Sequence, residues 1–232
     1  MIAAAPQTNT PITSTQYEMD VALKTLYAAK DLWVQTDVYE RIRLIDACIA
    51  SLREVIPQWV EANQQAKQIP SNHPGAADDW TFMTVAFRQL NLLRASLTEI
   101  ADGGLPSAVG AFTARPDDRL SVKVFPKGVK ESLTYGTISG EIWFNSGLTE
   151  SEVRAGQAKI YRNKSHAGRV ALVLGAGNMP GLIPGDFIYK LFAEDQVVAL
   201  KVNPVNAYMG PIIEAGYAPL VERGFLQVLY GG

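Results

Sequence analysis

The stretch VALVLGAGNMPGLIPGD, from Val170 to Asp186, decides the fold. An apolar run ends in a glycine-rich turn, and Pro180 and Pro184 stand where a helix should begin. The run Val170–Leu174 has the pattern of a strand covered on both faces. The turn after it is either a phosphate cradle for a dinucleotide or a loop that directs one polar side chain at a substrate.

The rest of this region repeats the same alternation. A helical stretch, Ile183–Ala193, leads to a second apolar strand, QVVALKV, and a helix over about Ala207–Arg223 leads to a third, FLQVLY. This β-α-β-α-β order is half of a doubly wound parallel sheet with right-handed crossovers. We therefore predict an α/β fold with a partial dinucleotide-binding domain over residues 164–232.

The first half of the chain has helical periodicity. Residues 1–16 are predicted to be a disordered lead-in, and residues 17–104 a helical layer. Asp37, with Glu40 three residues later, predicts a helix start, Pro57 predicts a kink or a restart, and Gly103 with Gly104 predicts a stop. The predicted buried faces are Met19, Ala22, Leu23, Leu26 and Tyr27; Ile42, Ile45, Ile49, Leu52 and Ile56; and Met83, Phe87, Leu90, Leu93 and Leu97.

The segment 105–163 changes character. The pieces SVKVFPKGV, GEIWF and AKIYRN are short, β-branched or aromatic, and separated by turn residues. We predict antiparallel strands or an extended arm. Such an arm either makes a contact in a homo-oligomer or lies against the helical layer of its own chain.

Composition excludes several classes of protein. The 232 residues are 47% hydrophobic and 19% charged with a net charge of -2, which argues against a nucleic-acid partner. No apolar stretch predicts a membrane span or a secretory signal. The one cysteine, Cys48, rules out an intramolecular disulfide and favours a reducing compartment, so we expect a cytoplasmic protein. No Cys/His cluster indicates a metal site.

The ends of the first two strands differ from the common dinucleotide fingerprint. Gly175, Gly177 and Gly181 give a spacing that is weak evidence by itself, since many turns need glycine. The second strand ends in Lys201, where the fingerprint has an acidic acceptor for the ribose hydroxyls. Lysine donates to hydroxyls or pairs with a 2′-phosphate, but it cannot accept.

Four features together resemble the aldehyde dehydrogenase superfamily: the helical N-terminal part, YRN before the first strand, GNMPG after it, and ALKVNP after the second. The resemblance implies that the Asn178 amide belongs to an oxyanion hole, that Lys201 contacts the adenosine ribose, and that Gly175, Ala176 and Gly177 line an NAD or NADP site. The alternative for Asn178 is a residue that merely tolerates a left-handed turn.

The sequence also departs from that family. Gly177 replaces a tryptophan of the cofactor groove, and Val202, Asn203 and Pro204 replace a Pro-Ser-Glu stretch. Pro204 stands in the place of the ribose-binding carboxylate, which makes NADP as plausible as NAD. These differences suggest a divergent branch, close to acyl-group reductases.

The family's cysteine nucleophile and glutamate base would lie downstream of the third strand, so we expect this chain to be the N-terminal part of a longer enzyme that is inactive alone. Cys48 lies in an apolar helical pattern and is predicted to be a half-buried structural thiol. No Cys or acidic residue stands at a suggestive spacing from His73 or His166, so we predict surface positions for both, and a helix cap for Asp78-Asp79. The remaining alternatives are an acyl-group reductase and a non-catalytic nucleotide-binding or assembly module.

Overall fold

The computed structural model of the chain describes residues 13–107 and 110–231. They form two compact units: the chain up to Arg94 together with the chain from Lys164 onward, and the segment Ala95–Asn163 between them. The predicted lead-in falls largely on residues 1–12, which lie outside the described residues. Its last residues do have a structure, because Thr15 forms a capping box with Glu18 at the start of the first helix.

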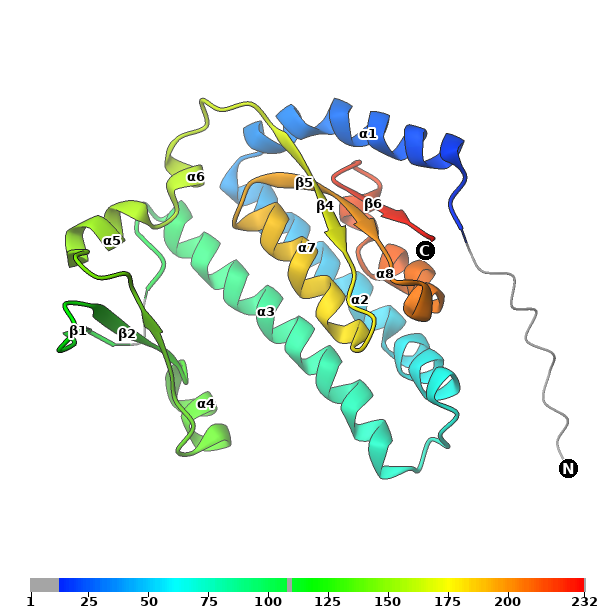
Figure 1. The fold of residues 1–232 in the computed structure, drawn as a ribbon, viewed down its shortest axis with the longest axis horizontal. Helices are drawn as coiled ribbons and strands as arrows, with labels where there is room; N and C mark the ends of the chain where they lie inside the picture. The colour runs from blue at the N-terminus through cyan, green and yellow to red at the C-terminus, as the bar shows by residue number, and fades with distance from the viewer. Residues whose placement is uncertain (1–12, 108–109, 232) are drawn as a thin grey trace, which may run out of the picture. The chain divides into compact units, whose positions relative to one another are not determined.

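Three helices open the chain (Figure 1): α1 (Gln16–Gln35), α2 (Val38–Lys67) and α3 (Ala77–Ala101). As predicted, Asp37 caps α2, and its side chain accepts from the backbone N–H of Glu40 at 2.8 Å. The helix does not restart at Pro57, which lies inside one continuous element. Gly103 follows α3 with a φ of 83°, a left-handed conformation that favours glycine and ends the helix.

The buried face of α1 differs from the predicted one. Leu23 is 41% and Tyr27 64% exposed, so both were wrongly placed in the core. Most of the buried residues are spaced three or four positions along the helix, and the last two are adjacent. They are Ala22, Leu26, Ala29, Trp33 and Val34. Trp33 determines this face, because its ring packs against Phe192 and Phe225 at centroid distances of 5.2 and 4.8 Å.

The predicted parallel sheet is confirmed. The strands β4 (Arg169–Leu174), β5 (Gln196–Lys201) and β6 (Leu226–Leu229) pair in that order, all in parallel. The helix α7 (Ile183–Phe192) connects β4 to β5. The helix predicted between β5 and β6 is instead three pieces: η3 (Pro204–Met209), α8 (Gly210–Gly216) and α9 (Ala218–Val221).

The interruption of that last helix has a local cause. Tyr217, between α8 and α9, has a φ of -117° and is not helical. Pro219 then occupies the first turn of α9, where its missing N–H costs nothing. The chain therefore starts a new helix there and does not continue the old one.

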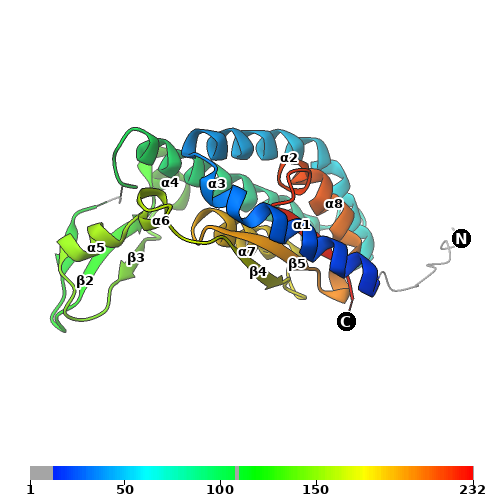
Figure 2. The ribbon, with the colours of Figure 1, turned by 90° about the horizontal axis from the view of Figure 1, so that it is seen from above.

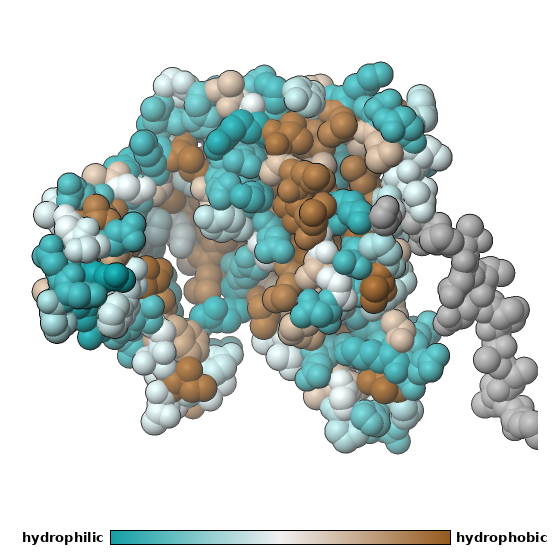
Figure 3. Space-filling model, in the orientation of Figure 1, coloured by the Kyte–Doolittle hydropathy of each residue, from teal (hydrophilic) through white to brown (hydrophobic). Residues whose placement is uncertain are grey.

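The central strand of the sheet is buried on both faces. Residues 197–200 of β5 are at most 2% exposed. Both α1 and α7 contact β4 and β5, and Figures 1 and 2 show α1 beside the parallel strands. On β4, in contrast, Leu172 and Leu174 are 65% and 67% exposed, and Figure 3 shows apolar surface over this strand. Among the described residues, β4 pairs with β5 alone.

The second unit contains an antiparallel sheet. Its elements are β1 (Phe112–Ala114), β2 (Leu120–Phe125), α4 (Gly128–Tyr135), β3 (Gly140–Trp143), α5 (Glu150–Gly156) and α6 (Lys159–Arg162). The strands pair in the order β1-β2-β3. The prediction that AKIYRN is extended is wrong, because this stretch forms the short helix α6. Arg162 stabilises this turn by donating to the carbonyl of Gln157 at 2.6 Å.

Candidate functional site

The turn after β4 contains the residues predicted to meet the cofactor. Gly175 extends the pairing with β5 by one step, since its N–H donates to the carbonyl of Lys201 at 2.9 Å. The turn then leads into the 3₁₀ helix η2 (Pro180–Leu182), and α7 begins only at Ile183. The prolines thus delay the α-helix, as predicted, and place a stiff bend at the tip of β4.

The turn after β5 lies against the first one. Asn203 precedes η3, and its side-chain oxygen accepts from the N–H of Val205 at 3.1 Å. The other side of the same carboxamide faces Gly177, where an added Cβ would lie 2.8 Å from Asn203 Nδ2. Glycine at position 177 therefore leaves room for the Asn203 side chain, which a larger residue would displace.

Asn206 joins the two turns, and the sequence analysis missed it. It is only 3% exposed, and its Nδ2 donates to the carbonyls of Ala176 at 2.8 Å and Gly177 at 3.1 Å. A polar residue in the apolar context PVNAYMG was the available signal, because a buried carboxamide needs hydrogen-bond partners. Its partners lie about 30 positions earlier in the sequence, so no local pattern identifies them.

Asn178 and Lys201 lie at the same end of the parallel sheet, at the tips of neighbouring strands. Asn178 is exposed, and its side chain has no hydrogen-bond partner within residues 13–107 and 110–231. Lys201 is half-buried and pairs in register with Leu174, so its side chain belongs to the sheet face that carries the exposed leucines. The described part of the chain offers its ammonium group no carboxylate.

Cys48 does not belong to these turns. It lies in α2, 1% exposed, so it is buried and not half-buried as predicted. Burial in an apolar environment raises the pKa of its thiol to about 12. A thiol with this pKa is not a nucleophile at neutral pH, which supports the structural role.

The other titratable candidates also have structural partners. His73 caps a 3₁₀ turn by accepting from Gly75 N–H at 3.0 Å. His166 is exposed, as predicted, and its Nε2 lies 3.2 Å from Oδ2 of Asp195, a residue distant in sequence. Asp79 is buried in the first turn of α3 and pairs with Lys67 at 2.6 Å, so it is an ion-pair partner and not the predicted cap.

Residues 13–107 and 110–231 contain no group of three or more His, Cys, Asp or Glu side chains that could hold a metal ion together. None of their helices is long and apolar enough to cross a membrane.

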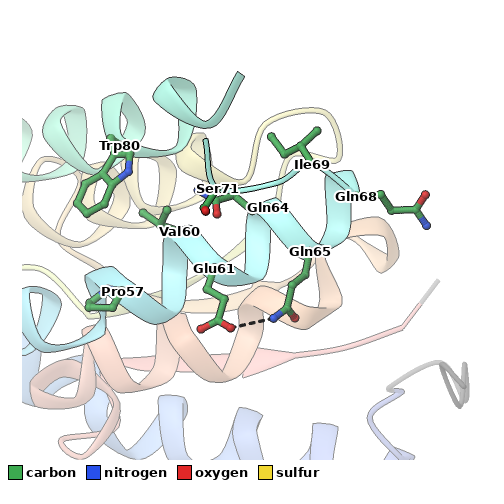
Figure 4. Close-up of a pocket in the computed structure, with 9 residues that line it drawn as sticks. All are labelled: Pro57, Val60, Glu61, Gln64, Gln65, Gln68, Ile69, Ser71 and Trp80. Atoms are coloured by element: carbon green, nitrogen blue, oxygen red, sulfur yellow. Dashed lines mark hydrogen bonds between the residues drawn. The ribbon is translucent and has the colours of Figure 1, made fainter. Parts of the chain in front are cut away.

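A cavity of about 610 Å³ lies away from the strand tips, between the end of α2 and the start of α3 (Figure 4). Trp80, which is 54% exposed, stands over the apolar Pro57 and Val60. Glu61 and Gln65 on its wall already bond to each other at 3.0 Å. No residue of the strand-tip turns lines this cavity, so it is not part of the candidate site.

Comparison with known proteins supports the fold. No family model and no curated protein matches this chain. A solved structure assigned as a methylmalonate-semialdehyde dehydrogenase from Sinorhizobium meliloti, complexed with NAD, is similar to it with a TM-score of 0.55 and 13% sequence identity. The match covers 95% of this chain and 35% of that one, so the chain spans about a third of the length of its structural neighbour. The likeness therefore concerns the fold of this part of that structure.

Proposed function

We propose that this chain supplies the dinucleotide-binding part of an NAD(P)-dependent oxidoreductase acting on aldehydes. One observation carries the proposal: the Asn178 amide and the Lys201 ammonium group stand at adjacent strand tips without a partner in the described part of the chain. Nucleotides bind at this end of doubly wound sheets. The fold of the NAD-bound neighbour is consistent with it.

The donors at the two tips fit a nicotinamide dinucleotide. The Lys201 ammonium group donates to ribose hydroxyls or pairs with a 2′-phosphate. Pro204 leaves no carboxylate next to Asn203 to repel that phosphate, so both NAD and NADP fit. In this proposal Gly175 and Ala176, which connect β4 to Gly177 and Asn178, line the cofactor site. When bound, a nicotinamide dinucleotide would supply a hydride acceptor.

Asn178 has the position and the chemistry of an oxyanion donor. Asn206 and Pro180 hold the backbone of its turn, and the exposed side-chain amide is available to a substrate oxygen. One oxyanion donor contributes about 3–4 kcal/mol to transition-state stabilisation. The substrate class that needs it is an aldehyde, whose carbonyl oxygen gains negative charge on nucleophilic attack.

In this proposal the nucleophile comes from outside the described residues. A thiol supplied there would add to the aldehyde carbonyl, and Asn178 would donate to the oxygen that gains negative charge. Cys48, the one cysteine, is buried and protonated. The burial of Cys48 also favours a second candidate function, a nucleotide-binding module without turnover. An acyl-group reductase would use the site in the reverse direction.

Calorimetric titration of NAD and NADP into the purified chain tests the assignment. Lys201→Ala should weaken binding by roughly 10–100-fold, the effect of losing a charge-assisted hydrogen bond. Lys24→Ala, at an exposed position of α1, is the matched control and should leave affinity unchanged. Asn178→Ala should also bind cofactor normally, since its role is toward the substrate. Equal affinity of wild type and Lys201→Ala would refute the role of Lys201, and aldehyde-dependent NAD(P)H formation by the chain alone would refute the need for an outside nucleophile.

A further inference from the structure

The cavity between the end of α2 and the start of α3 presents an uncovered aromatic ring. Trp80 is 54% exposed, and its indole stands over Pro57 and the buried Val60 (Figure 4). The indole N–H donates to no acceptor in residues 13–107 and 110–231. With a volume of about 610 Å³, the cavity has the size of a small-molecule site, and it combines a flat ring with an apolar base.

Two polar side chains of the same cavity have unused hydrogen-bonding capacity. Gln64 is half-buried and Ser71 is exposed, and neither side chain bonds to a residue in the described part of the chain. The Gln64 carboxamide carries a donor and an acceptor side by side, and the Ser71 hydroxyl both donates and accepts. A purely apolar ligand would bury the carboxamide without a partner, which is costly. The cavity therefore suits a ligand that donates and accepts.

The charge of the cavity argues against an anionic ligand. Among the described residues that line it, none is Lys, Arg or His, and one, Glu61, is a carboxylate. Glu61 accepts from Gln65 at 3.0 Å and would repel a phosphate or a carboxylate. A neutral sugar ring meets all of these conditions. Its hydroxyls donate and accept, and the C–H groups of one ring face form an apolar surface that stacks on an indole.

The backbone on both sides of the cavity is held in place. The helix α2 ends at Gln68, whose left-handed φ of 54° turns the chain toward α3. Across the cavity, Asp79 precedes Trp80 and is 1% exposed, and it pairs with Lys67 of α2 at 2.6 Å. This ion pair fixes the first turn of α3 against the end of α2. The positions of the two walls are therefore set without a ligand, which lowers the cost of binding one.

We propose that this cavity binds a neutral sugar ring, with one ring face on Trp80 and with hydroxyls bonded to Gln64 and Ser71. None of the described residues that line it belongs to the turns after β4 and β5. Sugar binding here is therefore a second property of the chain and does not depend on the proposed oxidoreductase function.

NMR of the indole N–H groups in the purified chain tests the proposal. The chain has four tryptophans, and the signal missing from Trp80→Phe identifies the Trp80 indole. Methyl β-glucopyranoside, whose equatorial hydroxyls leave both ring faces apolar, should shift this signal to saturation. The signals of Trp33 and Trp59, which are buried, should stay in place. An unmoved Trp80 signal would overturn the proposal.

Three further probes separate the contributions to binding. Cyclohexanol has the ring with a single hydroxyl, and sorbitol has the hydroxyls without a ring, so each should bind at least about tenfold more weakly than the glucoside. Equal affinity for either probe would overturn the proposal. Tighter binding of tetramethylammonium than of the glucoside would also overturn it, because Trp80 and Glu61 would then form a cation site.

Substitutions at the cavity should weaken glucoside binding. Trp80→Leu removes the ring and Gln64→Leu removes the carboxamide, and each should lower the affinity about tenfold. Trp143→Leu is the matched control and should bind like wild type, because Trp143 is also 54% exposed but has the Arg115 guanidinium over its ring at 4.9 Å. Circular dichroism verifies that each variant is folded. Wild-type affinity in both cavity variants, or an equal loss in Trp143→Leu, would refute the assigned contacts.

Discussion

Replacement of Arg41 by methionine tests the ion pair between α2 and the turn before β5. Arg41 is 2% and Asp195 1% exposed. Arg41 Nη2 lies 2.5 Å from Asp195 Oδ1 and 2.6 Å from the carbonyl oxygen of Trp33, and Nε donates to the carbonyl of Thr36 at 3.2 Å. The guanidinium also stacks on the Trp33 ring at 4.2 Å from its centroid. Methionine keeps much of the apolar stem and removes all of the donors.

The expected loss follows from what remains behind. Without Arg41, the buried Asp195 carboxylate keeps one side-chain contact, His166 Nε2 at 3.2 Å. Removal of one partner of a buried pair costs about 3–5 kcal/mol, and because His166 remains, we expect about 3 kcal/mol for Arg41→Met. This is a large part of a total stability of about 5–15 kcal/mol. Asp195→Asn should cost less, because asparagine keeps an acceptor and tolerates the left-handed φ of 58° at this position.

Urea unfolding followed by far-ultraviolet circular dichroism gives the free energies. The double variant Arg41→Met/Asp195→Asn should lose about 1–3 kcal/mol less than the sum of the single losses, since the two residues interact directly. Arg94→Met, in an exposed pair with Asp46, is the control and should cost under about 1 kcal/mol. A loss below about 1 kcal/mol for Arg41→Met, or strictly additive single losses, would show that the buried pair is not a stabilising unit.

Two further changes have defined outcomes. The Cys48 thiol ionises near pH 9 in the unfolded chain, whereas burial raises its pKa to about 12 in the folded one, so stability present below pH 9 is lost as pH rises, by up to about 1.4 kcal/mol per unit. The free energy of unfolding in urea, measured between pH 8 and 10, should fall with pH in this way for wild type and less steeply for Cys48→Ala. Equal pH dependences of the two proteins would contradict the prediction. Gly181→Ala would press a methyl group against the Phe82 ring and should lower the free energy of unfolding by about 1–3 kcal/mol in thermal or urea unfolding. The control is Gly185→Ala, whose Cβ would lie at an ordinary contact distance, 3.4 Å, from Gln89 Oε1, and it should be nearly neutral. Equal effects of the two substitutions would refute the clash.

The sequence predicts the parallel sheet well because each strand is a continuous apolar run followed by turn residues. The tips of β4 and β5 could be placed at one edge for the same reason, since parallel strands end on the same side. The face of α1 was missed because helical spacing alone does not say which of two adjacent apolar stripes is buried. Packing of Trp33 on Phe192 and Phe225, residues far away in sequence, decides it.

The polar contacts of the site were not predictable for a related reason. Asn206 with Ala176 and Gly177, like His166 with Asp195, joins residues about 30 positions apart. A short sequence pattern cannot predict such pairs, because they form only after α7 and β5 bring the turns together. The YRN stretch was misassigned as extended for a local reason: the helix α6 spans a single turn, too short for apolar periodicity to show.

The open face of β4 and the polar turn at its tip are one continuous surface. Leu172 and Leu174 alternate with the buried Ala171 and Val173, so the exposed leucines follow one face of the strand up to Gly175. This part of β4 carries neither a charge nor a proline, the devices by which exposed strands are usually protected from pairing. Any polypeptide that covers the two leucines also comes next to the turn that bears the proposed oxyanion donor.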